Sequence, residues 1–175
     1  GKSDYGLWML VVSMTAYFQL FDLGYVNGLV RQITDADARG DERAINEWVS
    51  TFAVVYAAIG AVALLATAAL AAWVVPRFPN LSAGQVTTAQ WVTVVLGIRI
   101  AVGFPMTVFG AVTTSRQYFA LSSSIAIAVS LLAALVTYLV LEAGYGLRVL
   151  VPATTAVNLL AYVAYGRAAW FAYPG

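Results

Sequence analysis

Residues 48–75 read WVSTFAVVYAAIGAVALLATAALAAWVV, and this stretch decides the fold class of the chain. It contains no charged residue and consists largely of Ala and Val. About 20 consecutive apolar residues are enough for a helix to cross the hydrocarbon core of a bilayer. Only helices and closed barrels span lipid, and the stretch lacks the period-two alternation of a barrel strand. We therefore expect a transmembrane helix here.

The rest of the chain has the same character. Of its 175 residues, 62% are hydrophobic and 10% are charged, and the mean hydropathy is +0.83. Soluble domains have about 45–50% apolar and about 25% charged residues, so a soluble enzyme and a disordered chain are disfavoured. We expect an all-α integral membrane protein with about five transmembrane helices, at about 5–30, 48–75, 90–113, 118–141 and 149–165.

Residues 31–47 interrupt the apolar pattern. Their sequence, RQITDADARGDERAINE, contains three Arg and five acidic residues, so we expect this connector to lie in water. Gly40 followed by Asp41 is typical of a helix end and a new N-cap. A membrane enzyme would need acidic metal ligands or a base at the membrane surface, and this is the only acidic cluster. Because the acids alternate with Arg at helical spacing, a solvated connector explains them better.

The distribution of basic residues between the loops predicts the orientation. Lys and Arg are enriched in short cytoplasmic loops of membrane proteins. Five basic residues fall on one side and three on the other, so the first side is expected to be cytoplasmic. The chain starts without Met and ends just after an apolar run, so we interpret it as part of a longer protein with at least one upstream helix. The two groups are Arg31, Arg39, Arg43, Arg116 and Arg167, against Lys2, Arg77 and Arg148.

The absence of two residue types limits the catalytic and metal-binding chemistry that the chain can perform. The chain has no Cys and no His, which removes disulfides, thiolate nucleophiles, the usual general base and the commonest metal ligand. We expect no catalytic residue, no metal and no cofactor. A net charge of +1 does not favour a nucleic-acid partner.

Two charged residues fall inside the expected spans. Asp22 lies in the first span, and Arg99 lies near the middle of the third. A charge at the bilayer centre costs from about 2.5 to well above 10 kcal/mol, so both should face protein or a water-filled cavity. A structural Asp–Arg pair between two helices is one reading, and a substrate or ion site is the other.

Polar and small residues recur at helical spacing on the expected spans. We expect four polar stripes to surround one hydrophilic interior, with space beside the Arg99 guanidinium at two glycines and a kink at Pro105. The second span instead has a small-residue face suited to helix packing, formed by Tyr56, Gly60, Ala63 and Thr67. The polar stripes are Thr15, Gln19 and Asp22; Arg99, Gly103, Met106, Gly110, Thr113 and Gln117; Ser123, Ser130 and Thr137; and Thr155, Asn158 and Tyr162.

Residues 5–41, YGLWMLVVSMTAYFQLFDLGYVNGLVRQITDADARGD, carry a further pattern. A Tyr-Gly-Leu-Trp opening, an Asp-Leu-Gly late in the helix, Arg31 at its exit and an Arg-Gly-Asp connector resemble the O-antigen flippase-like oligosaccharide flippases of bacterial polysaccharide synthesis. Their superfamily also holds the multidrug and toxin extrusion transporters. Ser-Arg-Gln-Tyr at 115–118 departs slightly from the Gln-Arg-Tyr turn frequent in the family. The fourth helix of the family is similar to the third span through Arg99, Pro105, Phe109, Gly110, Arg116 and Tyr118.

This resemblance implies a two-lobed fold of twelve to fourteen helices. Residues 1–175 would then form most of the N-terminal lobe, with the first helix and the C-terminal lobe of the same chain as partners. It implies a non-enzymatic, multi-pass flippase of the bacterial cytoplasmic (inner) membrane that moves a polyprenyl-diphosphate-linked oligosaccharide, as in O-antigen and lipopolysaccharide synthesis. Arg99, Gln19, Asn158 and Tyr162 would bind the substrate within membrane lipid. The alternative is a cation-coupled exporter of small amphiphiles, with Asp22 as the ion-coupling residue or as a partner of Arg99.

Overall fold

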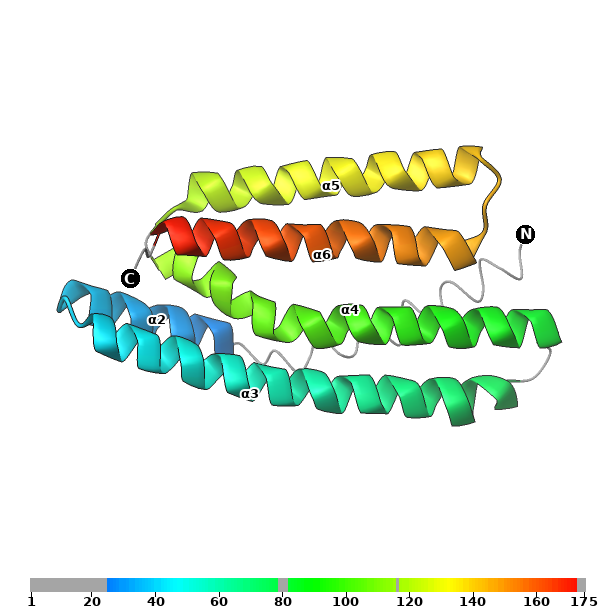
Figure 1. Cartoon of the computed structure of the whole chain (residues 1–175), viewed down its shortest axis with the longest axis horizontal. Coiled ribbons are helices and arrows are strands. Elements are labelled where there is room, and N and C mark those ends of the chain that lie inside the picture. The colour runs from blue at the N-terminus through cyan, green and yellow to red at the C-terminus, as the bar shows by residue number, and fades with distance from the viewer. Residues whose placement is uncertain (1–24, 79–81, 116, 173–175) are drawn as a thin grey trace.

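The computed structural model describes residues 25–78, 82–115 and 117–172. These ranges are helical with short connections and contain no strand, which confirms the all-α fold class. The α-helices, shown in Figure 1, are α2 (Tyr25–Ala38), α3 (Glu42–Ala69), α4 (Ala83–Ser115), α5 (Phe119–Glu142) and α6 (Leu147–Ala172).

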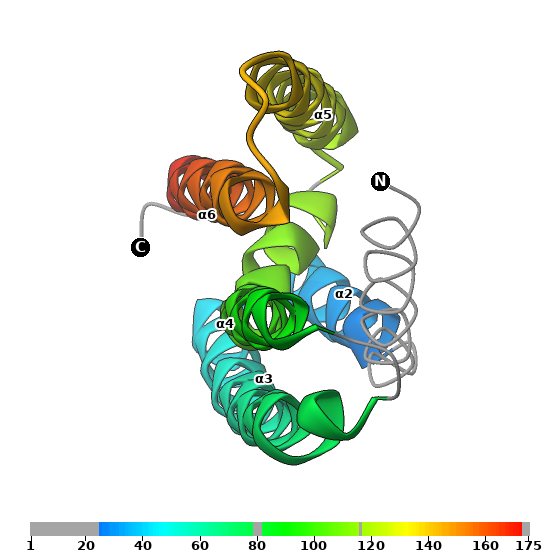
Figure 2. The same ribbon diagram turned by 90° about the vertical axis from the view of Figure 1, so that its right-hand side faces the viewer.

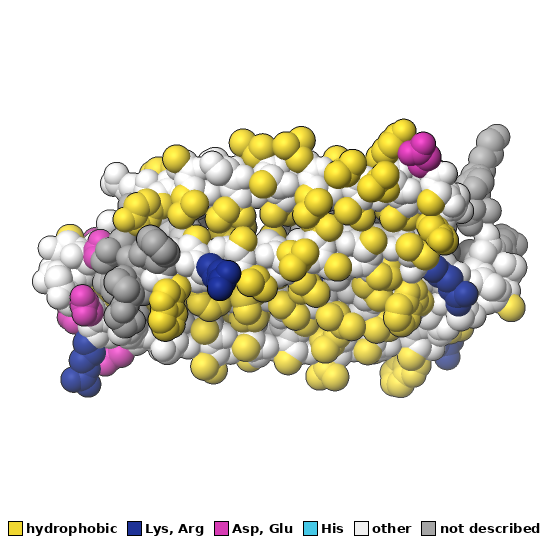
Figure 3. Space-filling view, turned by 45° about the horizontal axis from the view of Figure 1, so that its top comes forward, with side chains coloured by type: hydrophobic (Ala, Val, Ile, Leu, Met, Phe, Trp, Pro, Cys, Tyr) yellow, Lys and Arg dark blue, Asp and Glu magenta, His cyan; other side chains and the backbone are white. Residues whose placement is uncertain are grey.

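Four helical stretches in the described part are long and apolar enough to cross a membrane: Glu42–Arg77, Ala83–Ser115, Phe119–Glu142 and Leu147–Ala168. They match four of the five expected spans, and most of the fifth, at 5–30, lies outside the described residues. Figure 3 shows apolar side chains over the middle of one face and most charged side chains towards its two ends. The protein is therefore a multi-pass membrane protein.

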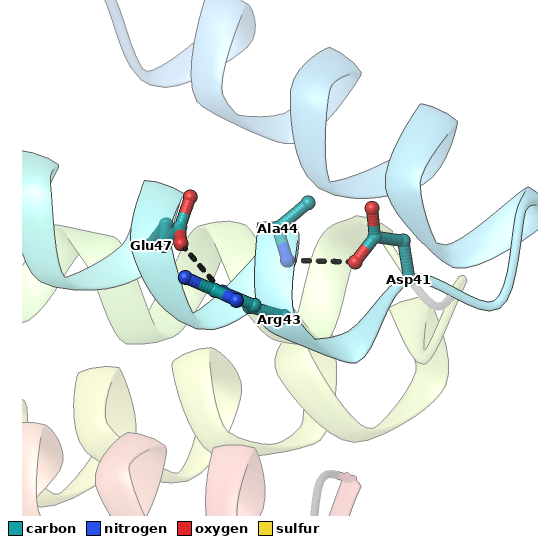
Figure 4. A network of polar contacts seen from close by, with 4 residues as sticks. All are labelled: Asp41, Arg43, Ala44 and Glu47. Carbon is teal, nitrogen blue, oxygen red and sulfur yellow. Dashed lines mark hydrogen bonds and ion pairs between the residues drawn. The ribbon is translucent and has the colours of Figure 1, made fainter.

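The connector at 31–47 is helical except for a short turn. Helix α2 continues to Ala38, and α3 already begins at Glu42. The expected break is confirmed, because Gly40 has a φ of 66° and the Asp41 carboxylate accepts a 3.0 Å hydrogen bond from the Ala44 N–H (Figure 4). The apolar side of α2 packs against α3 and α4 through the buried side chains Leu29, Ile33 and Ala36.

Helix α3 packs against α4 through the small-residue face expected from the sequence. All four of its members are buried, which confirms that interpretation: Tyr56, Gly60, Ala63 and Thr67. A Cβ added at Gly60 would lie 2.4 Å from the carbonyl oxygen of Ala101, and one added at Gly97 would lie 2.1 Å from the Thr67 hydroxyl. The two helices therefore approach so closely that only glycine fits at both points.

The end of α3 loosens into a π-helical turn (Leu70–Val74) followed by a 3₁₀ turn (Val75–Arg77). In this π turn each carbonyl accepts from the N–H five residues later, as the Leu70 carbonyl does from Val75. The Ala71 carbonyl would then need the N–H of residue 76. That residue is Pro76, which has no N–H. The side-chain amide of Gln90, on α4, donates to the Ala71 carbonyl instead, at 3.0 Å. Gln90 thus caps the end of a neighbouring helix.

Gln90→Met is expected to destabilise the protein by about 1–3 kcal/mol, because it leaves the buried Ala71 carbonyl without a partner. Thermal or denaturant unfolding in detergent measures this. Gln32→Met, at an exposed position of α2, is the matched control and should stay within about 0.5 kcal/mol of the parent. Pro76→Ala returns the missing N–H and should reduce the cost of Gln90→Met. If Gln90→Met lowered the stability equally with Pro76 and with Ala at position 76, the proposed role of Gln90 as a cap for the Ala71 carbonyl would be contradicted.

Helix α4 is central, with α3 on one side and α6 on the other, and α5 lies beyond α6 (Figures 1 and 2). Pro105 lies inside α4, and the C-terminal part of the helix leans away from the axis of the rest, as expected for a proline kink (Figure 1). The Tyr165 hydroxyl, on α6, donates to the Ser122 carbonyl of α5 at 3.2 Å. Helices α5 and α6 are therefore antiparallel, with the start of α5 beside the end of α6.

The expected polar interior does not extend to α5. This helix has no buried residue, and Ser123 and Ser130 are exposed while Thr137 is half-buried. Its half-buried residues lie on another stripe that includes Ser122, whose hydroxyl bonds that of Thr113 at 3.2 Å. The prediction of four polar stripes around one interior is therefore wrong for α5 in the described part of the protein. Serine side chains on an otherwise apolar helix do not by themselves identify the face that packs.

Candidate functional site: an arginine cluster between α4 and α6

Arg99 is the central residue of α4, which runs from Ala83 to Ser115. At a rise of about 1.5 Å per residue, it lies about 24 Å from either end of the helix. Its side chain is half-buried. A helix that spans the membrane therefore holds this guanidinium near the middle of the bilayer, where a permanent charge is most costly.

The partner of Arg99 is Asn158 on α6, 59 residues further along the chain. The guanidinium Nη2 donates to the Asn158 Oδ1 at 3.1 Å. The Asn158 Nδ2 in turn donates to the Thr154 carbonyl, one turn back on α6, at 2.7 Å. This second bond orients the amide so that its oxygen faces the arginine. The structure thus brings together two of the residues expected to form the site.

Tyr162 lies one turn beyond Asn158 and completes the cluster. Its hydroxyl packs against Gly103 on α4, where an added Cβ would lie 2.7 Å from the hydroxyl oxygen. Gly103 follows Arg99 by four residues, so the phenol lies beside the turn of α4 that follows the arginine. We expected Gly103 to leave space beside the guanidinium, and this was wrong, because Tyr162 fills that space. Gly110 does border open space as far as the described residues are concerned, since none of them on another helix lies within 4 Å of a Cβ built there.

Two other members of the expected stripes behave differently. Gln117 lies beyond the end of α4 in a left-handed turn conformation with a φ of 59°, so the α4 stripe stops before it. Thr155 is buried, and within the described ranges its hydroxyl has no hydrogen-bond partner. Thr155 precedes Asn158 by three residues and so lies on the same face of α6. The polar stripe of α6 therefore faces α4, through Asn158 on Arg99 and Tyr162 on Gly103.

The Arg99 guanidinium keeps its positive charge uncompensated among the described residues. Asn158 is neutral, and the one ion pair found in the described part joins Arg43 to Glu47 on α3 (Figure 4). After Glu47 the sequence contains a single acidic residue, Glu142, which ends α5. A guanidinium has five N–H donors, and one of them is engaged by Asn158. The others can bind an anion in a bidentate fashion.

Gln19 and Asp22 lie outside the described residues. Their assignment to the substrate site and to ion coupling or Arg99 pairing therefore stays a prediction. Two further features of the site were not predicted from the sequence: the bond from Asn158 to the Thr154 carbonyl, and the contact of the Tyr162 hydroxyl with Gly103. Every helical residue has a backbone carbonyl one turn back, so the residue type at 154 gives no signal for the first. The second depends on a contact between helices and has no signal in the local sequence.

No protein-family model matches the chain, and comparisons with curated proteins and with solved structures find no match either. The description of the protein therefore comes from its own fold and site. It is an all-α, multi-pass membrane protein in which an arginine at the centre of one long helix bonds a neutral asparagine of the neighbouring helix.

Proposed function

We propose that this protein is a flippase that moves a polyprenyl-diphosphate-linked oligosaccharide across the bacterial cytoplasmic membrane. The observation that carries the proposal is the position of Arg99, at the centre of α4 and without a carboxylate partner among the described residues. The sequence motifs at 5–41 and 99–118, which resemble oligosaccharide flippases, support the same function. The chain would act with further helices that form a second lobe.

The chemistry of such a cargo matches the site. A diphosphate carries negative charge that the hydrocarbon core does not solvate, so its passage requires a cation near the midpoint. Arginine suits this role because its planar guanidinium forms paired hydrogen bonds with phosphate oxygens and stays charged at any physiological pH. Asn158 restrains Arg99 without neutralising it. An aspartate at position 158 would neutralise the guanidinium charge that attracts the diphosphate of the cargo.

The same charge disfavours the alternative, a cation-coupled exporter of small amphiphiles. Many amphiphilic drugs are cationic, and an uncompensated guanidinium would repel them from this part of the protein. The exporter hypothesis depends on Asp22 as the coupling residue, and Asp22 lies outside the described residues.

Deletion of the gene from its host tests the proposal and separates the two functions. We expect lipid-linked oligosaccharide to accumulate in the inner leaflet and surface polysaccharide to be lost, with both restored by the plasmid-borne gene. Extraction of labelled lipid-linked oligosaccharide and analysis of surface polysaccharide measure these quantities. Unchanged surface polysaccharide together with increased sensitivity to amphiphilic drugs would refute the flippase and favour the exporter.

A further inference from the structure

The C-terminal part of α6 carries a second arginine in an apolar setting. An open groove of about 710 Å³ lies here, lined by Val163, Gly166, Arg167 and Trp170. No described residue outside the local turn of α6 lies within 4 Å of a Cβ built at Gly166, so this glycine leaves its side of the groove open. The side chain of Arg167 is exposed, and those of Val163 and Trp170 are 62% and 75% exposed.

The groove lies near the C-terminal end of α6 (Leu147–Ala172). The apolar run expected to cross the membrane ends at about residue 165, so Val163 lies within it and Arg167 and Trp170 follow it. Tryptophan and arginine are typical of the boundary between hydrocarbon and water. The lining thus changes over about 10 Å from apolar to cationic and then aromatic, so an acyl chain would lie beside Val163 and a phosphate beside Arg167.

The charged residues around the groove indicate which class of lipid headgroup it binds. Glu142 is the only acid after Glu47, and it ends α5 at the opposite end of the α5–α6 pair from Arg167, because the two helices are antiparallel. The acids at 35–47 flank the turn between α2 and α3, which lies at the same end of the molecule as the C-terminal end of α6 (Figure 1). None of the described residues that line the groove is acidic, and Arg167 is the one charged residue among them. An anionic headgroup therefore meets a guanidinium and no carboxylate among these lining residues.

We propose that this groove binds an anionic glycerophospholipid of the surrounding membrane, with Arg167 on the phosphate, Trp170 beside the headgroup and an acyl chain along Val163 and Gly166. The inference does not depend on the proposed function, since it requires only that α6 spans the membrane. It concerns a surface position, whereas the Arg99 cluster lies at mid-membrane between two helices.

Native mass spectrometry of the purified protein, titrated with phosphatidylglycerol or phosphatidylcholine, tests this proposal. We expect preferential binding of phosphatidylglycerol, and Arg167→Gln should weaken it about fivefold, as for the loss of one basic residue at an anionic surface. Arg167→Lys should keep most of the affinity, and Trp170→Ala should weaken the binding of both lipids. Binding of phosphatidylcholine should not change in Arg167→Gln.

Arg148→Gln is the matched control, because Arg148 is also exposed and lies in the first turn of the same helix, outside the groove. It should bind phosphatidylglycerol like the parent. An equal loss in Arg148→Gln would show a general effect of net charge and overturn the site. Parental affinity and selectivity in Arg167→Gln would overturn it as well. Circular dichroism and gel filtration in detergent establish that each variant is folded.

Discussion

Arg99→Ala is expected to reduce transport of lipid-linked oligosaccharide about 100-fold while the protein still inserts into the membrane. A hydrogen bond to a charged group contributes about 1.5–3 kcal/mol, and every 1.4 kcal/mol changes a rate or an affinity tenfold. Arg99→Lys keeps the charge but loses the planar fork, so we expect a smaller loss, of about tenfold. Restoration of surface polysaccharide in a strain without the chromosomal gene measures both effects.

Asn158→Asp separates a transport role of Arg99 from a structural one. The change is nearly isosteric, and it places a carboxylate oxygen where the amide oxygen now lies, 3.1 Å from the Arg99 Nη2. It also replaces the Nδ2 donor to the Thr154 carbonyl by an oxygen, so transport is compared at equal amounts of folded protein. If Arg99 binds the diphosphate, this internal anion competes with the cargo, and transport should fall nearly as far as in Arg99→Ala. If Arg99 is only a structural partner of α6, the new ion pair should leave transport unchanged.

The control for these variants is the amount of folded protein in the membrane, measured by immunoblotting and by gel filtration after solubilisation. Normal complementation by Arg99→Ala at a parental protein level would reduce Arg99 to a structural partner of Asn158. It would not by itself exclude a flippase, which the deletion phenotype tests independently.

Gly60→Ala is expected to destabilise the protein by about 2 kcal/mol, and Gly60→Leu to prevent its folding. A Cβ at this position lies 2.4 Å from the Ala101 carbonyl oxygen, and that atom belongs to the backbone of α4, which cannot move aside as a side chain can. Overpacking of a close contact typically costs about 1–3 kcal/mol, and the larger leucine exceeds what a small shift of the helices accommodates. Thermal stability and yield in detergent measure both changes.

Gly110→Ala is the matched control for Gly60→Ala. Both changes add one methyl group within a long helix, where alanine is favoured over glycine by about 1 kcal/mol. Among the described residues, none on another helix lies within 4 Å of a Cβ at Gly110, so this change should be neutral or stabilising. Opposite signs for the two variants are the expected result. Equal stability of the Gly60→Ala variant and the parent would mean that α3 and α4 are not held at this distance in the membrane.

Much of the fold was predictable because lipid restricts the possibilities. The apolar runs at 48–75, 90–113, 118–141 and 149–165 each became a helix that covers the whole run or nearly all of it, since a chain in hydrocarbon has to satisfy its backbone hydrogen bonds locally. The packing face of α3 was predictable for a related reason. Small residues at a period of about 3.6 mark the side on which two membrane helices approach, and Gly60 and Thr67 lie at that contact.

Prediction failed where a residue's surroundings depend on a second helix. Ser123 and Ser130 lie at helical spacing, but α5 packs through another stripe. Apolar residues surround both stripes, so hydrophobicity does not distinguish the face towards lipid from the face towards protein. Gly103 was expected to border empty space, and the hydroxyl of Tyr162 fills it.

The sequence by itself determined that this is a helical membrane protein with an arginine near mid-membrane, because the cost of moving polar groups into lipid depends on residue type and position along the chain. Only the tertiary structure decided that this arginine meets Asn158 of α6, that the Tyr162 hydroxyl packs on Gly103, and that Gln90 caps α3 at its π turn. These pairings depend on the rotation and register of each helix against its neighbour. Close contacts at single glycines fix this rotation and register. Such contacts involve two helices, so they cannot be predicted from one segment of sequence.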